Sequence, residues 1–444
     1  MVLALDGITL AHGVGGQKDL PISLGLAITG AVAALIVSFT VLAVAWRTPR
    51  YDAATSGRPA PVWLDVLVGS MAFRVLLRVL GFVVFGYTMV VAILGQNLLT
   101  NPLFGLFYVW LWVGLVPMSL LFGSFWKAIS PVRTINSMFA KISGSDPEQG
   151  VYIYPAWLGY WPAVLGLYAF VWIELVYPFA TEQAPVRLWL AAYVAVMLIG
   201  GALFGNTWYE RADPFEVYST LIGKLSIWAR REGRLLVRSP LANLDTVEAR
   251  PGLVAVVGVL FGSTVFDSFR ESPSWVQFIQ SSEVSLTLLN NLALLTFCAG
   301  ATLILVLGCV LTGVDRETRR RALPGLFAHS VVPIILGYVI AHYLTYFIEV
   351  GQRTLILASD PFSDGSNYLG TGDWKTRYWL IYEQGLVANI KVAAVVVGHV
   401  VGVTTAHDRA VKLLPRRHQL TGQLPLLVAM IVFTAGGLYL LFSA

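Results

Sequence analysis

The sequence predicts an all-α fold, a polytopic transmembrane bundle of about ten spanning helices with both termini outside the cytoplasm. Three observations predict this fold. Of the 444 residues, 57% are hydrophobic and only 12% are charged, whereas a soluble globular domain carries about 25% charged residues. Apolar runs of about 20 residues, the length that crosses the hydrocarbon core of a bilayer, recur from one end to the other. The basic residues gather in alternate connections between these runs.

Ten apolar runs are long enough to cross a membrane. We expect spans at residues 22–46, 79–97, 103–123, 158–179, 188–205, 252–269, 288–312, 326–349, 383–405 and 422–443. The second run is among the shortest, and Arg74 and Arg78 precede it, where long side chains extend to the interface. No stretch has the composition of a separate soluble domain, so we expect residues 1–444 to form a single integral membrane domain.

The Lys and Arg residues predict the orientation, because they are enriched on the cytoplasmic side of membrane proteins. Alternate connections, beginning after the first span, hold 23 of the 30 basic residues: 47–78, 124–157, 206–251, 313–325 and 406–421. The N-terminal segment 1–21 and the C-terminus therefore lie outside. The formal charge of +5 marks cytoplasmic loops that face the lipid bilayer and predicts no nucleic-acid partner.

Three connections have features of their own. The inner loop 206–251 contains an amphipathic stretch at 215–230, followed by a short hairpin around Glu232-Gly233. The outer loop 350–382 is rich in Asp, Gly and Ser and is expected to form a cap, with local turns at 360–365 rather than a calcium loop. The inner segment 125–134 is expected to be a structural anchor whose basic residues face anionic headgroups.

Charged residues within the spans are the candidate functional groups. A charge at the centre of a bilayer costs about 3 kcal/mol on insertion scales, so such residues usually face the bundle interior and often mark function. The predicted orientation places Glu174, Asp267, His342 and Lys391 in the outer half of the membrane. His12 lies outside, in a segment that can fold back over them. We therefore expect an outward-facing polar pocket.

The chemistry of this pocket has several interpretations. Two carboxylates and two histidines suit a divalent metal, with His12, His342, Glu174 and Asp267 as ligands. A metal-bound water, or a carboxylate base, would then serve hydrolysis, with Lys391 stabilising negative charge. The plainer interpretation is a buried ion pair of Glu174 or Asp267 with Lys391, and a transport site is the third.

Haem is favoured less than a divalent metal. Bis-histidine ligation needs two rings at one depth, and His342 and His399 differ by about 13 Å along their helices. His329 and His399 are closer in depth and stay open as a pair. The chain contains neither a P-loop nor a Gly-x-Ser-x-Gly elbow, so no ATP-driven pump or serine hydrolase of that type is predicted.

Motifs along essentially the whole chain resemble a family of actinobacterial membrane proteins, many of which carry the label fenitrothion hydrolase. The matching runs include AHGVGG (11–16), LFYVWLWVGLVPMSLLFG (106–123), SPVRT (130–134), LGYWPAVLGLYAFVWIELVYP (158–178), GSTVFDS (262–268), FAHSVVPIILGYVIAHY (327–343) and GHVVGVTTAHDRA (398–410). The resemblance implies a bacterial cytoplasmic membrane and hydrolysis of a small lipophilic phosphotriester. The patterns shared with the family include His12, Glu174, Asp267, His329, His342, His399, His407 and Asp408.

Three functions are thus expected from the sequence. The first is a metal-assisted hydrolase of lipophilic esters or phosphoesters, with Glu174, Asp267, His342 and Lys391 as the catalytic groups. The second is a transporter or channel-like protein that uses the same buried carboxylate, Lys and His cluster. The third is a respiratory-complex accessory or haem-binding scaffold.

Overall fold

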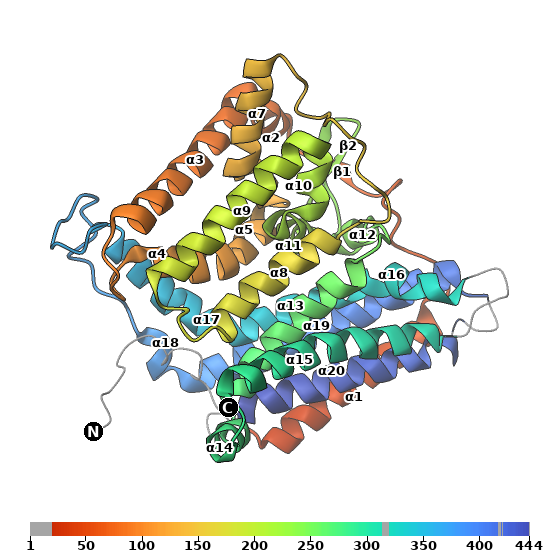
Figure 1. Ribbon diagram of the computed structural model, residues 1–444. Coiled ribbons are helices and arrows are strands. Elements are labelled where there is room, and N and C mark those ends of the chain that lie inside the picture. The colour runs from red at the N-terminus through yellow and green to blue at the C-terminus, as the bar shows by residue number, and fades with distance from the viewer. Residues whose placement is uncertain (1–19, 313–318, 416–418, 420, 444) are drawn as a thin grey trace. The chain divides into compact units, whose positions relative to one another are not determined.

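The computed structural model describes residues 20–312, 319–415, 419 and 421–443 (Figure 1). Within these residues, nine helical segments are long and apolar enough to cross a membrane: Leu24–Ala45, Met71–Leu94, Pro102–Phe122, Gln183–Phe204, Leu253–Arg270, Leu286–Val310, Arg320–Leu357, Gln384–Leu413 and Thr421–Phe442. The expected helical fold is therefore confirmed, and nine of the ten predicted spans correspond to such segments.

The predicted span at 158–179 is a shorter helix, α8 (Trp161–Leu175). Its 15 residues rise about 22 Å, less than the roughly 30 Å of a hydrocarbon core. Pro162 fixes its start. The helix ends at Leu175, shortly before Pro178. A proline disfavours the helical conformation for the residue that precedes it, so the helix stops before this point. The second span also differs from its predicted bounds. It starts at Met71, where Ser70 caps the helix by accepting the Phe73 N–H.

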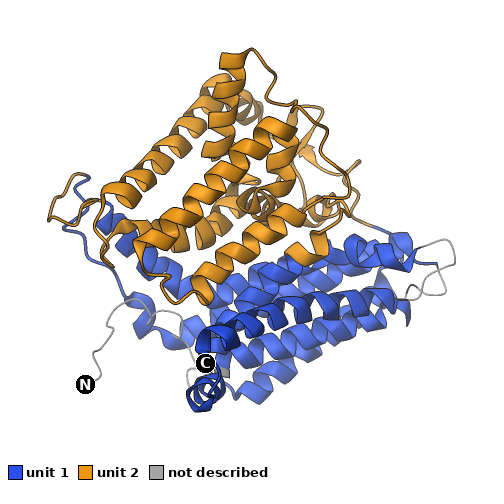
Figure 2. Ribbon diagram, in the orientation of Figure 1, with its two compact units in different colours: residues 1–49, 257–358, 369–444 blue, residues 50–256, 359–368 orange. Residues whose placement is uncertain are grey.

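The chain divides into two compact units, coloured separately in Figure 2. Unit 1 comprises Met1–Pro49, Val257–Ala358 and Leu369–Ala444, and unit 2 comprises Arg50–Val256 and Ser359–Tyr368. Both units consist of equally apolar helices, so no change of composition along the sequence marks the division.

Unit 1 is a bundle of long helices. Its α-helices are α1 (Leu24–Ala45), α13 (Leu253–Arg270, from Val257 onward), α14 (Pro273–Ser281), α15 (Leu286–Val310), α16 (Leu323–Phe327), α17 (Val332–Leu357), α18 (Trp379–Tyr382), α19 (Gln384–Leu413) and α20 (Leu424–Ser443). Short 3-10 turns cover Arg320–Ala322, Ala328–Val331 and Thr421–Gln423. Helix α19 packs against α17, α1 and α20, and α20 also packs against α15 (Figure 1).

Glycines allow the closest helix contacts of unit 1. A Cβ atom on Gly398 of α19 would lie 2.5 Å from the Pro333 carbonyl oxygen of α17. A Cβ atom on Gly258 of α13 would lie 1.8 Å from the Thr302 hydroxyl of α15. Membrane helices pack through such small residues because the bilayer provides no hydrophobic drive between them. These contacts fix α13 and α17, the two helices that carry the candidate site.

Unit 2 combines helices with one small sheet. Its helices are α2 (Val62–Gly69), α3 (Met71–Leu94), α4 (Pro102–Phe104), the π-helix η2 (Gly105–Val113), α5 (Leu115–Phe122), α6 (Phe125–Ile129), α7 (Pro131–Ser143), α8, α9 (Gln183–Phe204), α10 (Asn206–Ala212), α11 (Pro214–Gly223) and α12 (Pro240–Leu244). Its strands are β1 (Arg58–Pro59), β2 (Trp228–Arg231) and β3 (Arg234–Val237), paired antiparallel in the order β1-β3-β2. The expected hairpin is present, and Glu232 and Gly233 form its turn with φ values of 51° and 80°.

Helix α11 forms the core of unit 2. It lies within the stretch expected to be amphipathic, yet nine of its ten residues are buried, because it packs against α5, α6, α8 and α10. Asp213 caps its first turn by accepting the N–H groups of Phe215 and Glu216. Aromatic rings surround it, and Trp112 of η2 stacks on Tyr218 at 4.8 Å. This part of the loop is thus interior, whereas the hairpin of β2 and β3 in the same loop has exposed residues.

The segment 125–134 differs from its interpretation as a headgroup anchor. Arg133 is 9% exposed and forms an ion pair with Glu216 of α11. Lys127 forms an ion pair with Glu210 of α10. Arg133 therefore joins α7 to α11 within unit 2, whereas the Lys127–Glu210 pair is about half exposed. By contrast, the expected local turns at 360–365 are present, because the Asp360 carboxylate accepts the N–H groups of Asp364 and Gly365.

Candidate functional site

A buried polar cluster joins α13 and α17 in unit 1. Asp267 and Ser268 come from the last turns of α13, and Tyr338, His342 and Tyr343 come from the middle of α17. We call these five residues the Asp267–His342 cluster. Each is at most 3% exposed. Tyr338 and His342 are four residues apart and share one face of α17, which is the face that meets α13.

Asp267 is the acceptor of the cluster. Its Oδ2 atom accepts the His342 Nε2–H at 2.9 Å and the Tyr343 hydroxyl at 2.8 Å. Its Oδ1 atom lies 3.3 Å from Arg270 Nε, one turn further along α13. A buried carboxylate is tolerated when charged and polar donors compensate its lost hydration. Asp267 has two hydrogen-bond donors at Oδ2 and the positive charge of Arg270 beside Oδ1.

Ser268 extends the hydrogen bonds beyond His342. Its hydroxyl lies 3.0 Å from His342 Nδ1, and it accepts the Tyr338 hydroxyl at 3.1 Å. With Nε2–H directed to Asp267, a neutral His342 accepts the Ser268 proton at Nδ1, and a protonated His342 donates there instead. The result is a continuous chain of hydrogen bonds from Tyr338 through Ser268 and His342 to Asp267.

Further charges lie next to Asp267. Glu271 directly follows α13, and its pKa is raised to about 7, first by burial and then by the negative charge of Asp267. His342, Arg270 and Lys391 act in the opposite direction and lower the pKa of Glu271. Lys391 of α19 is 2% exposed. The electrostatics of Glu271 thus link it to Asp267, His342 and Lys391.

The predicted site residues divide into three groups. Asp267 and His342 contact each other directly, and Lys391 belongs to the same set of charges. Glu174 lies on α8 and belongs to unit 2, and His12 lies outside the described residues. Sequence reasoning missed Ser268, Tyr338, Tyr343 and Glu271. The signals for two of them were the four-residue spacing of Tyr338 and His342 and the position of Ser268 beside Asp267.

The described residues do not fit the expected metal site. Among them, no group of three or more His, Cys, Asp or Glu side chains is placed to hold a metal ion. In the Asp267–His342 cluster, both ring nitrogens of His342 are already engaged, one by Asp267 and one by Ser268. A metal at this position would have to displace one of those two partners.

The pair of His329 and His399 does not fit a haem. A Cβ atom on Gly402, three residues after His399, would lie 2.7 Å from the carbonyl oxygen of Ser330, the residue after His329. The backbones that carry these histidines are therefore in contact, and a macrocycle has no space between them at that point. His329 Nδ1 lies 3.0 Å from the Leu326 carbonyl oxygen, and His399 Nδ1 lies 2.8 Å from that of Val395.

Comparison of the chain with family models, characterised proteins and solved structures finds no match. Function must therefore be argued from the site. The Asp267–His342 cluster can accept and pass a proton, because imidazole, carboxylate and hydroxyl groups are linked in series. It also contains the partners of a nucleophilic serine, with Ser268 beside a histidine that a carboxylate orients.

Proposed function

We propose that this protein is a proton-translocating transport protein of the bacterial cytoplasmic membrane, with its proton-binding site at the Asp267–His342 cluster. The unbroken hydrogen-bond chain from Tyr338 to Asp267, buried between two membrane-spanning helices, is the observation that carries the proposal. Ionisable residues inside a membrane are costly and characteristically form proton relays in pumps and transporters. In this cluster, hydrogen bonds join Asp267, His342, Ser268 and Tyr338 directly.

The charge composition of the cluster also supports this function. When Glu271 is ionised, Asp267 and Glu271 oppose Arg270 and Lys391, so two carboxylates stand against two cations. One added proton leaves the group with an excess positive charge in a medium of low dielectric constant. Such a group binds a proton and releases it again when its surroundings change. A purely structural ion pair needs neither His342 nor the hydroxyl chain.

Proton flux into proteoliposomes tests the proposal. The purified chain is reconstituted, the membrane potential is clamped, the outside is acidified, and a trapped dye reports the internal pH. We expect faster acidification than in protein-free liposomes, with the excess lost in Asp267→Asn and His342→Gln. Glu283→Gln is the matched control, since Glu283 is an exposed carboxylate of unit 1. Wild-type flux equal to that of empty liposomes would contradict the proposal.

The orientation, with both termini outside, belongs to the same proposal and rests on the distribution of Lys and Arg. Cysteine labelling tests it, because both native cysteines, Cys298 and Cys309, are buried. An impermeant maleimide added to intact cells is expected to label Asp364→Cys and not Arg234→Cys. The reverse labelling pattern would invert the topology.

A hydrolase is the second candidate, supported by the geometry of Ser268, His342 and Asp267. The hydroxyl is 3.0 Å from the base, and the base is 2.9 Å from its carboxylate. Against it, Ser268 is 1% exposed, so an ester needs an opening to reach the hydroxyl. Turnover of an aryl phosphotriester that is lost in Ser268→Ala, without loss of folded protein, would establish this activity. No turnover by the wild-type protein would exclude it for that substrate class.

A further inference from the structure

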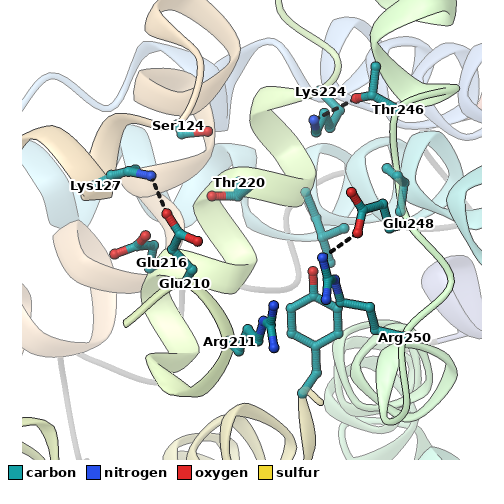
Figure 3. A pocket seen from close by; sticks show the side chains of 13 residues that line it. Ser124, Lys127, Glu210, Arg211, Glu216, Thr220, Lys224, Thr246, Glu248 and Arg250 are labelled. Atoms are coloured by element: carbon teal, nitrogen blue, oxygen red, sulfur yellow. Dashed lines mark hydrogen bonds and ion pairs between the residues drawn. The ribbon is translucent and has the colours of Figure 1, made fainter. Parts of the chain in front are cut away.

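A charged cavity of about 230 Å³ lies within unit 2, apart from the Asp267–His342 cluster (Figure 3). It has room for several water molecules, at roughly 30 Å³ each. Its wall includes residues of α6, α10 and α11 and of the segment that follows α12. Apart from Tyr160, the residues of the wall come from the two connections 124–157 and 206–251, which carry basic residues and are expected to face the cytoplasm.

Most carboxylates of the cavity wall already have a cationic partner. Lys127 lies 2.6 Å from Glu210, and Arg250 forms an ion pair with Glu248. Glu216 is bound by Arg133, whose guanidinium contributes two hydrogen bonds. The negative charge of the wall is therefore compensated locally.

Two cations of the wall have no such partner. Lys224 donates its one hydrogen bond in the described chain to a neutral hydroxyl, Thr246 Oγ1, at 2.6 Å (Figure 3). Burial lowers the pKa of Lys224, the nearby charge of Arg238 lowers it further, and the charge of Glu248 opposes them. Arg211 lies 5.3 Å over the Tyr154 ring, and among the described residues it forms no ion pair with a carboxylate. The cavity wall thus carries four cations, Lys127, Arg211, Lys224 and Arg250, against the three carboxylates Glu210, Glu216 and Glu248.

We propose that this cavity binds a phosphate group, held by Lys224 and Arg211. A guanidinium and an ammonium group are the usual partners of phosphate oxygens, and such charge-assisted hydrogen bonds are the strong ones. Arg211 comes from α10, and Lys224 follows the last turn of α11. Neither a single helix end nor a run of surface lysines forms the site.

The phosphate has two possible sources with the same chemistry. One is a soluble phosphorylated molecule of the cytoplasm, and the other is the headgroup of an anionic phospholipid of the inner leaflet. Both depend on the orientation proposed above, which places connections 124–157 and 206–251 inside. The ligand-binding measurement itself does not depend on that orientation or on proton transport.

Binding of two probes distinguishes the sources. The full chain is purified in detergent for titration with glycerol phosphate, and is reconstituted in nanodiscs with or without phosphatidylglycerol for native mass spectrometry. We expect Lys224→Gln and Arg211→Gln each to weaken binding by about ten- to a hundredfold, the effect of one lost charged hydrogen bond. Lys224→Arg, which keeps the charge, should retain most of the affinity.

Arg234→Gln is the control, because Arg234 is an exposed residue of β3 in the same connection and does not line the cavity. Glycerol phosphate binding that is lost in both variants supports a soluble ligand. If the protein retains phosphatidylglycerol but does not bind glycerol phosphate, and the same variants lose the lipid, the result supports a lipid headgroup as the ligand. Binding of neither probe, or equal losses in Arg234→Gln, would overturn the proposal.

Discussion

The ion pair of Arg133 and Glu216 provides the sharpest test of how unit 2 is held together. Arg133 Nε and Nη2 lie 2.6 and 2.7 Å from the two oxygens of Glu216, and the side chains are 10% and 1% exposed. Burial lowers the pKa of Arg133, but the hydrogen bond and charge of Glu216 outweigh it, so the net pKa is raised. Arg133 also donates to the Asn206 carbonyl oxygen at 3.3 Å.

Glu216→Gln keeps the shape of the side chain and removes its charge. The substitution leaves a buried guanidinium without a counter-ion, which costs about 3–5 kcal/mol. For a unit of this size, each kcal/mol lowers the Tm by roughly 2–4 °C, so we expect a fall of roughly 6–20 °C. Replacing both partners by apolar residues, Arg133→Met with Glu216→Leu, should cost less than either single substitution, because no charge stays buried.

Thermal unfolding of the detergent-solubilised protein, followed by Trp fluorescence, measures both effects. Glu210→Gln is the matched control, since the Lys127–Glu210 pair has the same 2.6 Å separation but side chains 48% and 47% exposed. Exposed pairs contribute only about 0–1 kcal/mol. Equal shifts for Glu216→Gln and Glu210→Gln, or a double variant that loses the sum of both single effects, would refute the reasoning.

Three further predictions concern packing and protonation. Gly258→Val should lower the yield of folded protein, because the new side chain would collide with the Thr302 hydroxyl. Adding Thr302→Ala should recover part of that yield. The monodisperse yield on size-exclusion chromatography measures both effects. Burial raises the pKa of Asp213 to about 7, and the charge of Glu216 adds to this rise. The carboxyl therefore stabilises the folded state fully at pH values below its ordinary pKa. This stabilisation is lost as the pH rises through about 7. Asp213→Asn should flatten that part of the Tm–pH curve. The pKa of Glu271 is also raised to about 7. The Glu271→Gln variant should therefore release fewer protons than the wild type in a dye-monitored pH jump around that value.

The sequence predicted the membrane-spanning helices well because their signal is local. Length and apolarity suffice for a span such as α15, and a cap such as Ser70 changes only where a helix begins. The wide turns of η2 and the burial of α11 depend on packing between segments far apart in the chain. Arg133 and Glu216 are 83 positions apart, and neither residue alone indicates its partner.

The sequence predicted those residues of the candidate site that are ionisable, because burying a charge is costly. Asp267, His342 and Lys391 attract notice in apolar runs because a charge in a bilayer is costly. Ser268 and Tyr338 do not, since an uncharged hydroxyl costs less to bury than a charge. The Ser268 hydroxyl can also donate to the Thr264 carbonyl oxygen of its own helix. The sequence could therefore indicate which charges were present, whereas the hydroxyl groups that link them in series emerged only from the packing of α13 on α17.

One double substitution separates charge balance from proton transport in this cluster. Asp267→Asn alone leaves the cations Arg270 and Lys391 in excess, so we expect a loss of stability of about 3 kcal/mol or more, as for other buried charges deprived of a partner. Lys391→Met in the same chain removes one excess cation and should recover part of the Tm. Proton flux should stay absent, because the acceptor of His342 no longer titrates. If flux returns together with the Tm, Asp267 serves only as a counter-charge, and the proton pathway must run through other residues.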